Sequence, residues 1–334
     1  MSTVSSPTGA SFARKRRHVV ASIASIGALA GLSLAGATPA LAATDADCQA
    51  ANTVDADAAG TETDIQNLLN DVTVPVVCLS GTFVLTTTLN YDRNLTIFGL
   101  PGAVLDGNNL VRILDDALLN SALTVENLRL TQGGNGAGAG GAVSADVVFV
   151  QNSIFDNNSA NFGGAISASE ATIEGSTFTD NLADFGGAVV VVSDVTVTDS
   201  TFALNEAGTA GGAIISYGTA TVNSSTFADN SGGSAGGAIV ASSGVDVINS
   251  TFVRNSTDDG GAGGAIAAFQ GAIVQSTFID NSTGGGDGES LFSTASEDGL
   301  TIQGNIFAGT GAAAQVGDSN TVADLGGNIF STSA

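Results

Sequence analysis

Residues 163–181 read GGAISASEATIEGSTFTDN, and residues 186–205 repeat the same plan as GGAVVVVSDVTVTDSTFALN. Two further copies follow, GGAIISYGTATVNSSTFADN at residues 211–230 and GGAIVASSGVDVINSTFVRN at residues 236–255. Every copy opens with Gly-Gly-Ala and closes with Phe-x-x-Asn. An internal period of this length governs the whole fold, because each repeat is one structural unit that stacks on its neighbours.

Three markers define the repeat, and each occurs six times in register. The first glycine of the pair recurs in steps of 23, 23, 25, 25 and 27 residues, at Gly140, Gly163, Gly186, Gly211, Gly236 and Gly263. The phenylalanine recurs at Phe155, Phe178, Phe202, Phe227, Phe252 and Phe278. The asparagine follows three residues later, at Asn158, Asn181, Asn205, Asn230, Asn255 and Asn281.

Each repeat has the pattern of short β-strands. The segment before the phenylalanine alternates apolar and polar residues, as in Thr172-Ile173-Glu174, and it is rich in Thr and Val. This period of two is typical of strands with one buried face. A unit of this length cannot bury its apolar face alone, so successive units must share one core. The sequence therefore predicts an all-β solenoid.

The spacing within the repeat predicts what each marker does. The step from the first glycine to the phenylalanine is 15 or 16 residues in all six units, whereas the stretch from the asparagine to the next glycine holds between 4 and 7 residues. Like side chains of the fixed part should stack at about 4.8 Å, the spacing of neighbouring strands. We expect the phenylalanines in the core, the asparagines as an amide ladder in a turn, and Gly-Gly-Ala at a tight corner.

Weaker copies extend the solenoid beyond the clear repeats of residues 140–281. From these we assign residues 94–334 to the parallel β-helix and residues 43–93 to an N-terminal cap. Within the cap, Ile65, Leu68 and Leu69 lie at helical spacing behind Thr61, which predicts a short amphipathic helix over the open end of the core.

The N-terminal sequence indicates export. Residues 1–42 combine a basic start, an apolar run and Ala40-Leu41-Ala42, which together are typical of a signal peptide cleaved after Ala42. We therefore expect a secreted, extracellular or cell-surface protein that does not span the membrane once this segment is removed. In that compartment the isolated pair Cys48 and Cys78 should form a disulfide.

Composition excludes several kinds of chemistry. Removal of residues 1–42 would remove the only His and the only Lys, leaving Arg93, Arg112, Arg129 and Arg254 as the cations against 32 acidic residues. Nucleic acid and anionic lipid are therefore excluded as expected partners, because both require neutralising cations. Catalytic mechanisms that use a Ser-His-Asp or Cys-His arrangement are also excluded, because the mature chain would have no His to act as the base.

The paired GGA[IV] and Phe-x-x-Asn signatures resemble the polymorphic outer-membrane-protein repeat. The resemblance covers residues 140–281 and implies a single-stranded right-handed parallel β-helix. It also implies roles in surface display, adhesion or the envelope. We accordingly expect a non-enzymatic protein, a monomer, whose partner is a surface protein or a glycan.

The second functional hypothesis is a polysaccharide-active enzyme, because the same fold occurs in pectate lyases and glycoside hydrolases. Arg254 is the candidate base, although stacking should place it between Asp229 and Asp280 in a structural ladder. A carboxylate pair could involve Asp258 and Asp259 with other acids of the variable loops, Asp184 and Glu206.

Two further features have simpler interpretations. Residues 284–290, GGGDGES, form a single glycine-rich acidic stretch, so we assign no metal site and no cofactor and expect only loose Ca²⁺ binding by the acidic surface. The threonines before the phenylalanines should form one outward row, at Thr177, Thr201, Thr226, Thr251 and Thr277. Such a row suggests ice or mineral binding as a third hypothesis, but β-propensity alone accounts for it.

Overall fold

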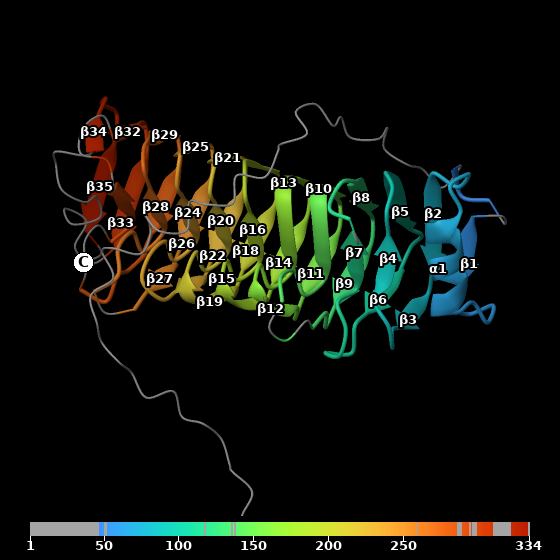
Figure 1. Ribbon diagram of the computed structural model, residues 1–334. Coiled ribbons are helices and arrows are strands. Elements are labelled where there is room, and N and C mark those ends of the chain that lie inside the picture. The colour runs from blue at the N-terminus through green and yellow to red at the C-terminus, as the bar shows by residue number, and fades with distance from the viewer. Residues whose placement is uncertain are drawn as a thin grey trace, which may run out of the picture.

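The computed structural model describes residues 47–49, 52–116, 118–134, 136, 138–258, 260–285, 289–293, 295, 299–309 and 322–332. The predicted signal peptide, residues 1–42, lies outside these ranges. The described chain forms an elongated rod of stacked coils (Figure 1). In that view the rod runs from the blue N-terminal elements on the right to the red C-terminal strands on the left.

Three parallel sheets form the sides of the rod, and we name them sheets A, B and C. Sheet A contains 19 strands, sheet B 11 and sheet C 5. The strands of sheet A are β1 (Thr53–Asp55), β2 (Val76–Ser80), β4 (Leu89–Tyr91), β5 (Leu95–Gly99), β7 (Leu114–Asp116), β8 (Ala122–Glu126), β10 (Val143–Gln151), β13 (Ile166–Glu174), β16 (Val189–Val191), β17 (Val195–Thr198), β20 (Ile214–Ser216), β21 (Thr219–Asn223), β24 (Ile239–Ala241), β25 (Gly244–Ile248), β28 (Ile266–Ala268), β29 (Gly271–Val274), β31 (Leu291–Ser293), β32 (Leu300–Gln303) and β34 (Val322–Asp324).

Sheets B and C complete each coil. Sheet B consists of β3 (Thr82–Val84), β6 (Val104–Asp106), β9 (Arg129–Thr131), β11 (Ile154–Asp156), β14 (Thr177–Thr179), β18 (Thr201–Ala203), β22 (Thr226–Ala228), β26 (Thr251–Val253), β30 (Thr277–Ile279), β33 (Ile306–Gly309) and β35 (Ile329–Thr332). Sheet C consists of β12 (Ser159–Phe162), β15 (Leu182–Phe185), β19 (Glu206–Ala210), β23 (Ser231–Gly232) and β27 (Ser256–Thr257). The predicted β-solenoid is confirmed.

The N-terminal helix predicted from residues 65–69 is α1 (Glu62–Asn70). Thr61 is its N-cap and forms a capping box with Asp64, which satisfies the first free amides of the helix. Ile65 and Leu69 are buried and join the main core. At the other end Arg93 donates to the carbonyls of Leu68 and Leu69, in the last turn of the helix.

The parallel ladder begins before residue 94, the start of the β-helix expected from the sequence. β1 pairs with β2, β2 pairs with β5, and β3 pairs with β6, all in parallel. These early coils lack the Gly-Gly-Ala and Phe-x-x-Asn markers, so the repeat pattern does not reveal them. The coil and the cap therefore overlap in sequence. Cys48 and Cys78 form a disulfide that ties the described N-terminal residues to β2.

The phenylalanines of the repeat form one column in the core. Phe155 pairs with Phe178, and the column continues to Phe278 with neighbouring ring centroids 4.7–5.0 Å apart. It extends to Phe307 and Phe330. All six rings of the clear repeats are fully buried. Burying each such side chain contributes about 1.5–3 kcal/mol, so this column is a main source of stability.

Backbone bends separate the three sheets. In the coil that starts at Gly186, left-handed residues occur at Gly186, Asp199 and Leu204, with φ of 60°, 49° and 56°. The glycine is required at the first corner, because in the preceding coil a Cβ on Gly163 would lie 1.9 Å from the carbonyl oxygen of Ile166. The corner predicted from Gly-Gly-Ala is present in the structure.

Candidate interaction surface

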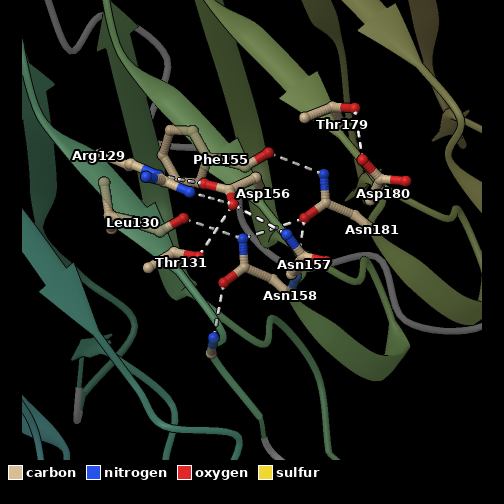
Figure 2. Close-up of polar contacts among 11 residues, drawn as sticks. Arg129, Leu130, Thr131, Phe155, Asp156, Asn157, Asn158, Thr179, Asp180 and Asn181 are labelled. Carbon is tan, nitrogen blue, oxygen red and sulfur yellow. Dashed lines mark hydrogen bonds and ion pairs between the residues drawn. The ribbon is translucent and has the colours of Figure 1, made fainter.

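The buried asparagines connect neighbouring coils at the second bend. Asn158 donates its side-chain amide to Asn181 Oδ1 at 3.0 Å (Figure 2). Asn181 donates to Asn205 Oδ1 at 2.9 Å in the same way. The same contact continues through Asn230, Asn255 and Asn281. Each amide also donates to a backbone carbonyl, as Asn181 does to Phe155. These side chains therefore stabilise the rod and are not open to a ligand.

A second buried ladder was missed by the sequence analysis. The backbone amide of Ser176 donates to Ser200 Oγ at 3.1 Å, and Ser176 Oγ donates to the carbonyl of Glu174 at 2.8 Å. Equivalent bonds run along the rod through Ser153, Ser176, Ser200, Ser225, Ser250 and Ser276. The signal was present in the sequence, since a serine lies two residues before each of the six repeat phenylalanines.

Asp156 is a buried carboxylate at the centre of a polar cluster in which Arg129 and Asn157 are exposed (Figure 2). Arg129 donates Nε to Asp156 Oδ1 at 2.7 Å and Nη2 to Oδ2 at 2.8 Å. Thr131 Oγ1 and Asn157 Nδ2 also donate to Oδ2. Burial raises the pKa of Asp156, but the hydrogen bonds from Arg129, Asn157 and Thr131 outweigh it, so the pKa lies below its usual range. The carboxylate is stabilised as an anion with its oxygens occupied, which suits a structural role.

Arg254 contacts one of its two expected partners. Its guanidinium binds Asp229 through two hydrogen bonds of 2.7 and 2.6 Å. The expected direct contact with Asp280 is wrong, and only a longer-range attraction to that carboxylate remains. The guanidinium uses Nε and Nη2 for the two oxygens of Asp229, and this bidentate pairing directs it toward one neighbouring coil. Hydrogen bonds from Arg254 to Asp229 raise the pKa of the guanidinium further, which makes it a poor base.

Two of the loop carboxylates considered from the sequence, Asp184 and Asp258, lie far apart. Asp184 and Asp258 occupy the same outward row of sheet C, with Gly208 and Gly233 between them. Three coil steps separate the two acids by roughly 14 Å, beyond the roughly 5–9.5 Å of glycosidase pairs. Glu206 lies on a neighbouring row, since it pairs with Leu182. Asp259 lies outside the described residues, as do residues 286–288 of the glycine-rich stretch.

A cavity of about 470 Å³ lies at the N-terminal end, between β1 and α1. Asp55, Asp64 and Asn67 are among its lining residues. Asp64 is engaged by Thr61, whose hydrogen bonds lower the pKa of the carboxyl group. Among the residues that the structure describes, no group of three His, Cys, Asp or Glu side chains is arranged to hold a metal ion.

A second hydrophobic cluster lies outside the main core, on the outer side of sheet A. Val190, Ile215, Val240 and Ala267 stack in register on successive strands, and Phe292 continues the row. They alternate with inward residues such as Val189, so the repeat directs them out of the coil. Val190, Ile215, Val240 and Ala267 are only 2–7% exposed, because side chains on both sides pack over them.

Aromatic and aliphatic side chains border this row. On the sheet C side Phe162 and Phe185 stack with ring centroids 5.3 Å apart, and Phe162 is 39% exposed. On the other side lie Val192 and Phe269, exposed by 46% and 44%, with the half-buried Tyr217 between them along the rod. Burial raises the pKa of the Tyr217 hydroxyl. We call the whole surface the outer strip: Phe162, Phe185, Val190, Val192, Ile215, Tyr217, Val240, Ala267, Phe269 and Phe292.

The sequence analysis did not identify the outer strip, because it assigned phenylalanine to the core. Phe162, Phe185 and Phe269 lie outside the phenylalanine column. Their signal was their place in the repeat: Phe162 and Phe185 directly precede a glycine pair, at the end of sheet C strands. The variable loop thus carries side chains that face outward.

Comparison with known families supports the fold. The family model for the right-handed β-helix region matches residues 104–252, which include the clearest repeats. With the parallel pairing of all three sheets, this makes the chain a right-handed parallel β-helix. The comparison with curated proteins gave no match, and the comparison with solved structures gave none either. Within the described residues, no helix is long and apolar enough to cross a membrane.

Proposed function

We propose that this chain is an exported, non-enzymatic β-helix that binds other surface molecules through the outer strip, in adhesion or in the structure of the envelope. The observation that carries the proposal is the strip itself. Successive coils place apolar side chains outside the main core, and its borders leave Phe162, Val192 and Phe269 substantially exposed. Contiguous exposed apolar surface is typical of interaction sites.

The resemblance to the polymorphic outer-membrane-protein repeat supports the same role. Six paired copies of GGA[IV] and Phe-x-x-Asn carry it, and proteins with this repeat act in surface display and adhesion. The fold alone would not favour binding over catalysis, because β-helices serve both.

Export is supported by two features of the N-terminal region. The sequence pattern of residues 1–42 predicts a signal peptide, and Cys48 is disulfide-bonded to Cys78. Disulfides persist mainly in oxidising compartments, so we place the protein outside the cell or on its surface. We expect a monomer that recognises a surface protein or a glycan.

The enzymatic alternative has weaker support from the described residues. All four arginines expected in the mature chain have structural partners: Arg93 caps α1, while Arg112, Arg129 and Arg254 pair with Asp115, Asp156 and Asp229. Asp184 and Asp258 are too widely spaced for a glycosidase pair. A cationic helper or a close carboxylate pair would therefore have to be assembled from other groups.

The proposal can be tested by measuring binding and turnover on the same preparation. Fluorescently labelled mature protein should be retained on intact cells of the producing species in a saturable way. The same protein should release no reducing sugar or unsaturated product from a polysaccharide panel, with or without Ca²⁺. Turnover without saturable retention would reverse the ranking of the two functions.

A further inference from the structure

Building on this proposed function, we infer that the outer strip recognises a cationic polypeptide segment, one that presents apolar side chains together with Lys or Arg. Protein partners are favoured over glycans by the aromatic geometry, and cationic partners are favoured by the acids that flank the strip.

The orientation of the aromatic rings disfavours a sugar. Phe162 and Phe185 are nearly parallel and stacked, with an interplanar angle of 8° and centroids 5.3 Å apart. Each ring therefore covers one face of the other, which leaves less open ring face than two separate rings would present. Sugars bind the open face of an aromatic ring, whereas aliphatic and aromatic side chains pack well against edges.

The charges beside the strip are negative on both sides. Asp184 directly precedes Phe185 and is exposed, and Asp258 lies further along the same row. On the other side the exposed Asp194 accepts a hydrogen bond from the backbone amide of Thr219, two residues from Tyr217. Glu170 lies on the same side in an earlier coil. A second copy of this acidic chain would be repelled here, as would nucleic acid or an anionic membrane.

Arg112, which lies beside the coil that carries Phe162, already binds other groups of this chain. Arg112 pairs with Asp115 and donates to the carbonyls of Ala139 and Gly140, next to the coil that carries Phe162. Arg112 therefore does not pair with the carboxylates that flank the strip, and these carboxylates can bind the cations of a partner. Lys or Arg side chains of a partner would form ion pairs with these carboxylates, while the apolar side chains of the partner would contact the aromatic borders of the strip.

The length of the strip sets the size of the segment. The central row runs over four coil steps from Val190 to Phe292, or roughly 19 Å at strand spacing. About six residues of extended polypeptide cover that distance. Because the central row is almost buried, the exposed borders at Phe162, Val192 and Phe269 should supply most of the contact.

The test uses synthetic peptides of about twelve residues with alternating Leu and Lys, and matched peptides with Glu in place of Lys or Ser in place of Leu. Binding to the full mature protein is measured by fluorescence anisotropy and isothermal titration calorimetry. We expect the Leu-Lys peptide to bind at least about tenfold more tightly than either control. Equal binding of the Leu-Glu or the Ser-Lys peptide would overturn the inference.

Variants locate the site. The double variant Phe162→Ser, Phe269→Ser should weaken Leu-Lys binding by about tenfold, whereas Leu204→Ser, Ile248→Ser, at exposed apolar positions elsewhere, should change it by less than about twofold. Asp184→Asn, Asp194→Asn should weaken it and reduce its salt dependence more than the matched Asp180→Asn, Asp246→Asn. Equal effects of a strip variant and its control would place the binding elsewhere and overturn the inference. Unchanged circular-dichroism melts show that each variant is folded.

A competition experiment separates this inference from the proposed function. The Leu-Lys peptide should displace labelled protein from cells. If cells retain the protein through the strip and the peptide fails to compete, the inference is wrong while the binding function stands. If cells do not retain the protein at all, the proposed function fails first.

Discussion

Asn205 Oδ1 accepts two hydrogen bonds from Asn181, one from the backbone nitrogen at 3.2 Å and one from the side-chain amide at 2.9 Å. The Asn205 amide in turn donates to Asn230 and to the carbonyl of Phe178. A single buried side chain therefore connects its own coil to both neighbouring coils. The repeat needs asparagine at this position because no other side chain of this size both donates and accepts in this way.

Substitution of Asn205 by Ala should be strongly destabilising. It would leave the backbone and side-chain donors of Asn181 and the carbonyl of Phe178 unpaired in the interior, at about 1–3 kcal/mol for each unsatisfied group. We expect a large drop in the urea midpoint. Leu204→Ala, at the exposed neighbouring position, is the control and should shift the midpoint little. Similar shifts in the two variants would argue against the ladder.

The phenylalanine column should tolerate truncation less well than the strip. Phe202 is fully buried and stacks on Phe178 and Phe227, so Phe202→Ala should cost about 3–5 kcal/mol. Phe162→Ala, at a partly exposed ring, should cost much less. Chemical unfolding of both variants checks this order. A Phe162 variant as unstable as the Phe202 variant would mean that the strip serves mainly as a second core.

The Asp156 cluster predicts an acid-sensitive contribution to stability. The pKa of Asp156 is lowered in the folded protein because the hydrogen bonds and the charge of Arg129 outweigh burial. The carboxylate therefore stabilises the fold fully above its unfolded pKa of about 4, and this contribution disappears as the pH falls through the lower folded value. Asp156→Asn should lose less stability than wild type between pH 5 and pH 2, as followed by urea midpoints. Parallel pH profiles would contradict the role of the cluster.

The corner glycines predict a contrast between two left-handed positions. Gly163 and Gly102 have φ of 61° and 84°, so Ala is disfavoured in the backbone of either. A Cβ at Gly163 would also collide with the carbonyl of Ile166, whereas Gly102 has open space. Gly163→Ala should therefore lower the melting temperature much more than Gly102→Ala. Equal losses would mean that the tight corner is not a steric requirement.

The sequence was most informative where identical residues stack. Phe178 and Asn181 recur at a fixed distance from a glycine pair, so their columns follow directly from the period. The helix around Ile65 was also predictable, because its cap and spacing are local signals. The early coils were less accessible, since β2 and β5 carry no repeat markers and their pairing depends on tertiary contacts.

The candidate surface was harder to predict for a related reason. Phe155 and Phe162 are the same residue type in the same repeat, but Phe155 is in the core while Phe162 lies at the end of a variable loop and faces outward. Composition cannot distinguish these environments. Likewise, the strand pattern places Arg254 between Asp229 and Asp280 but does not encode which of the two carboxylates its guanidinium binds.

The most direct test of strip-mediated binding is the retention of labelled mature protein on intact cells, compared between the wild type, the Phe162→Ser, Phe269→Ser variant and the Leu204→Ser, Ile248→Ser control. We expect saturable retention of the wild type and the control and loss of most retention in the strip variant. Equal retention of all three folded proteins would contradict the proposed role of the outer strip.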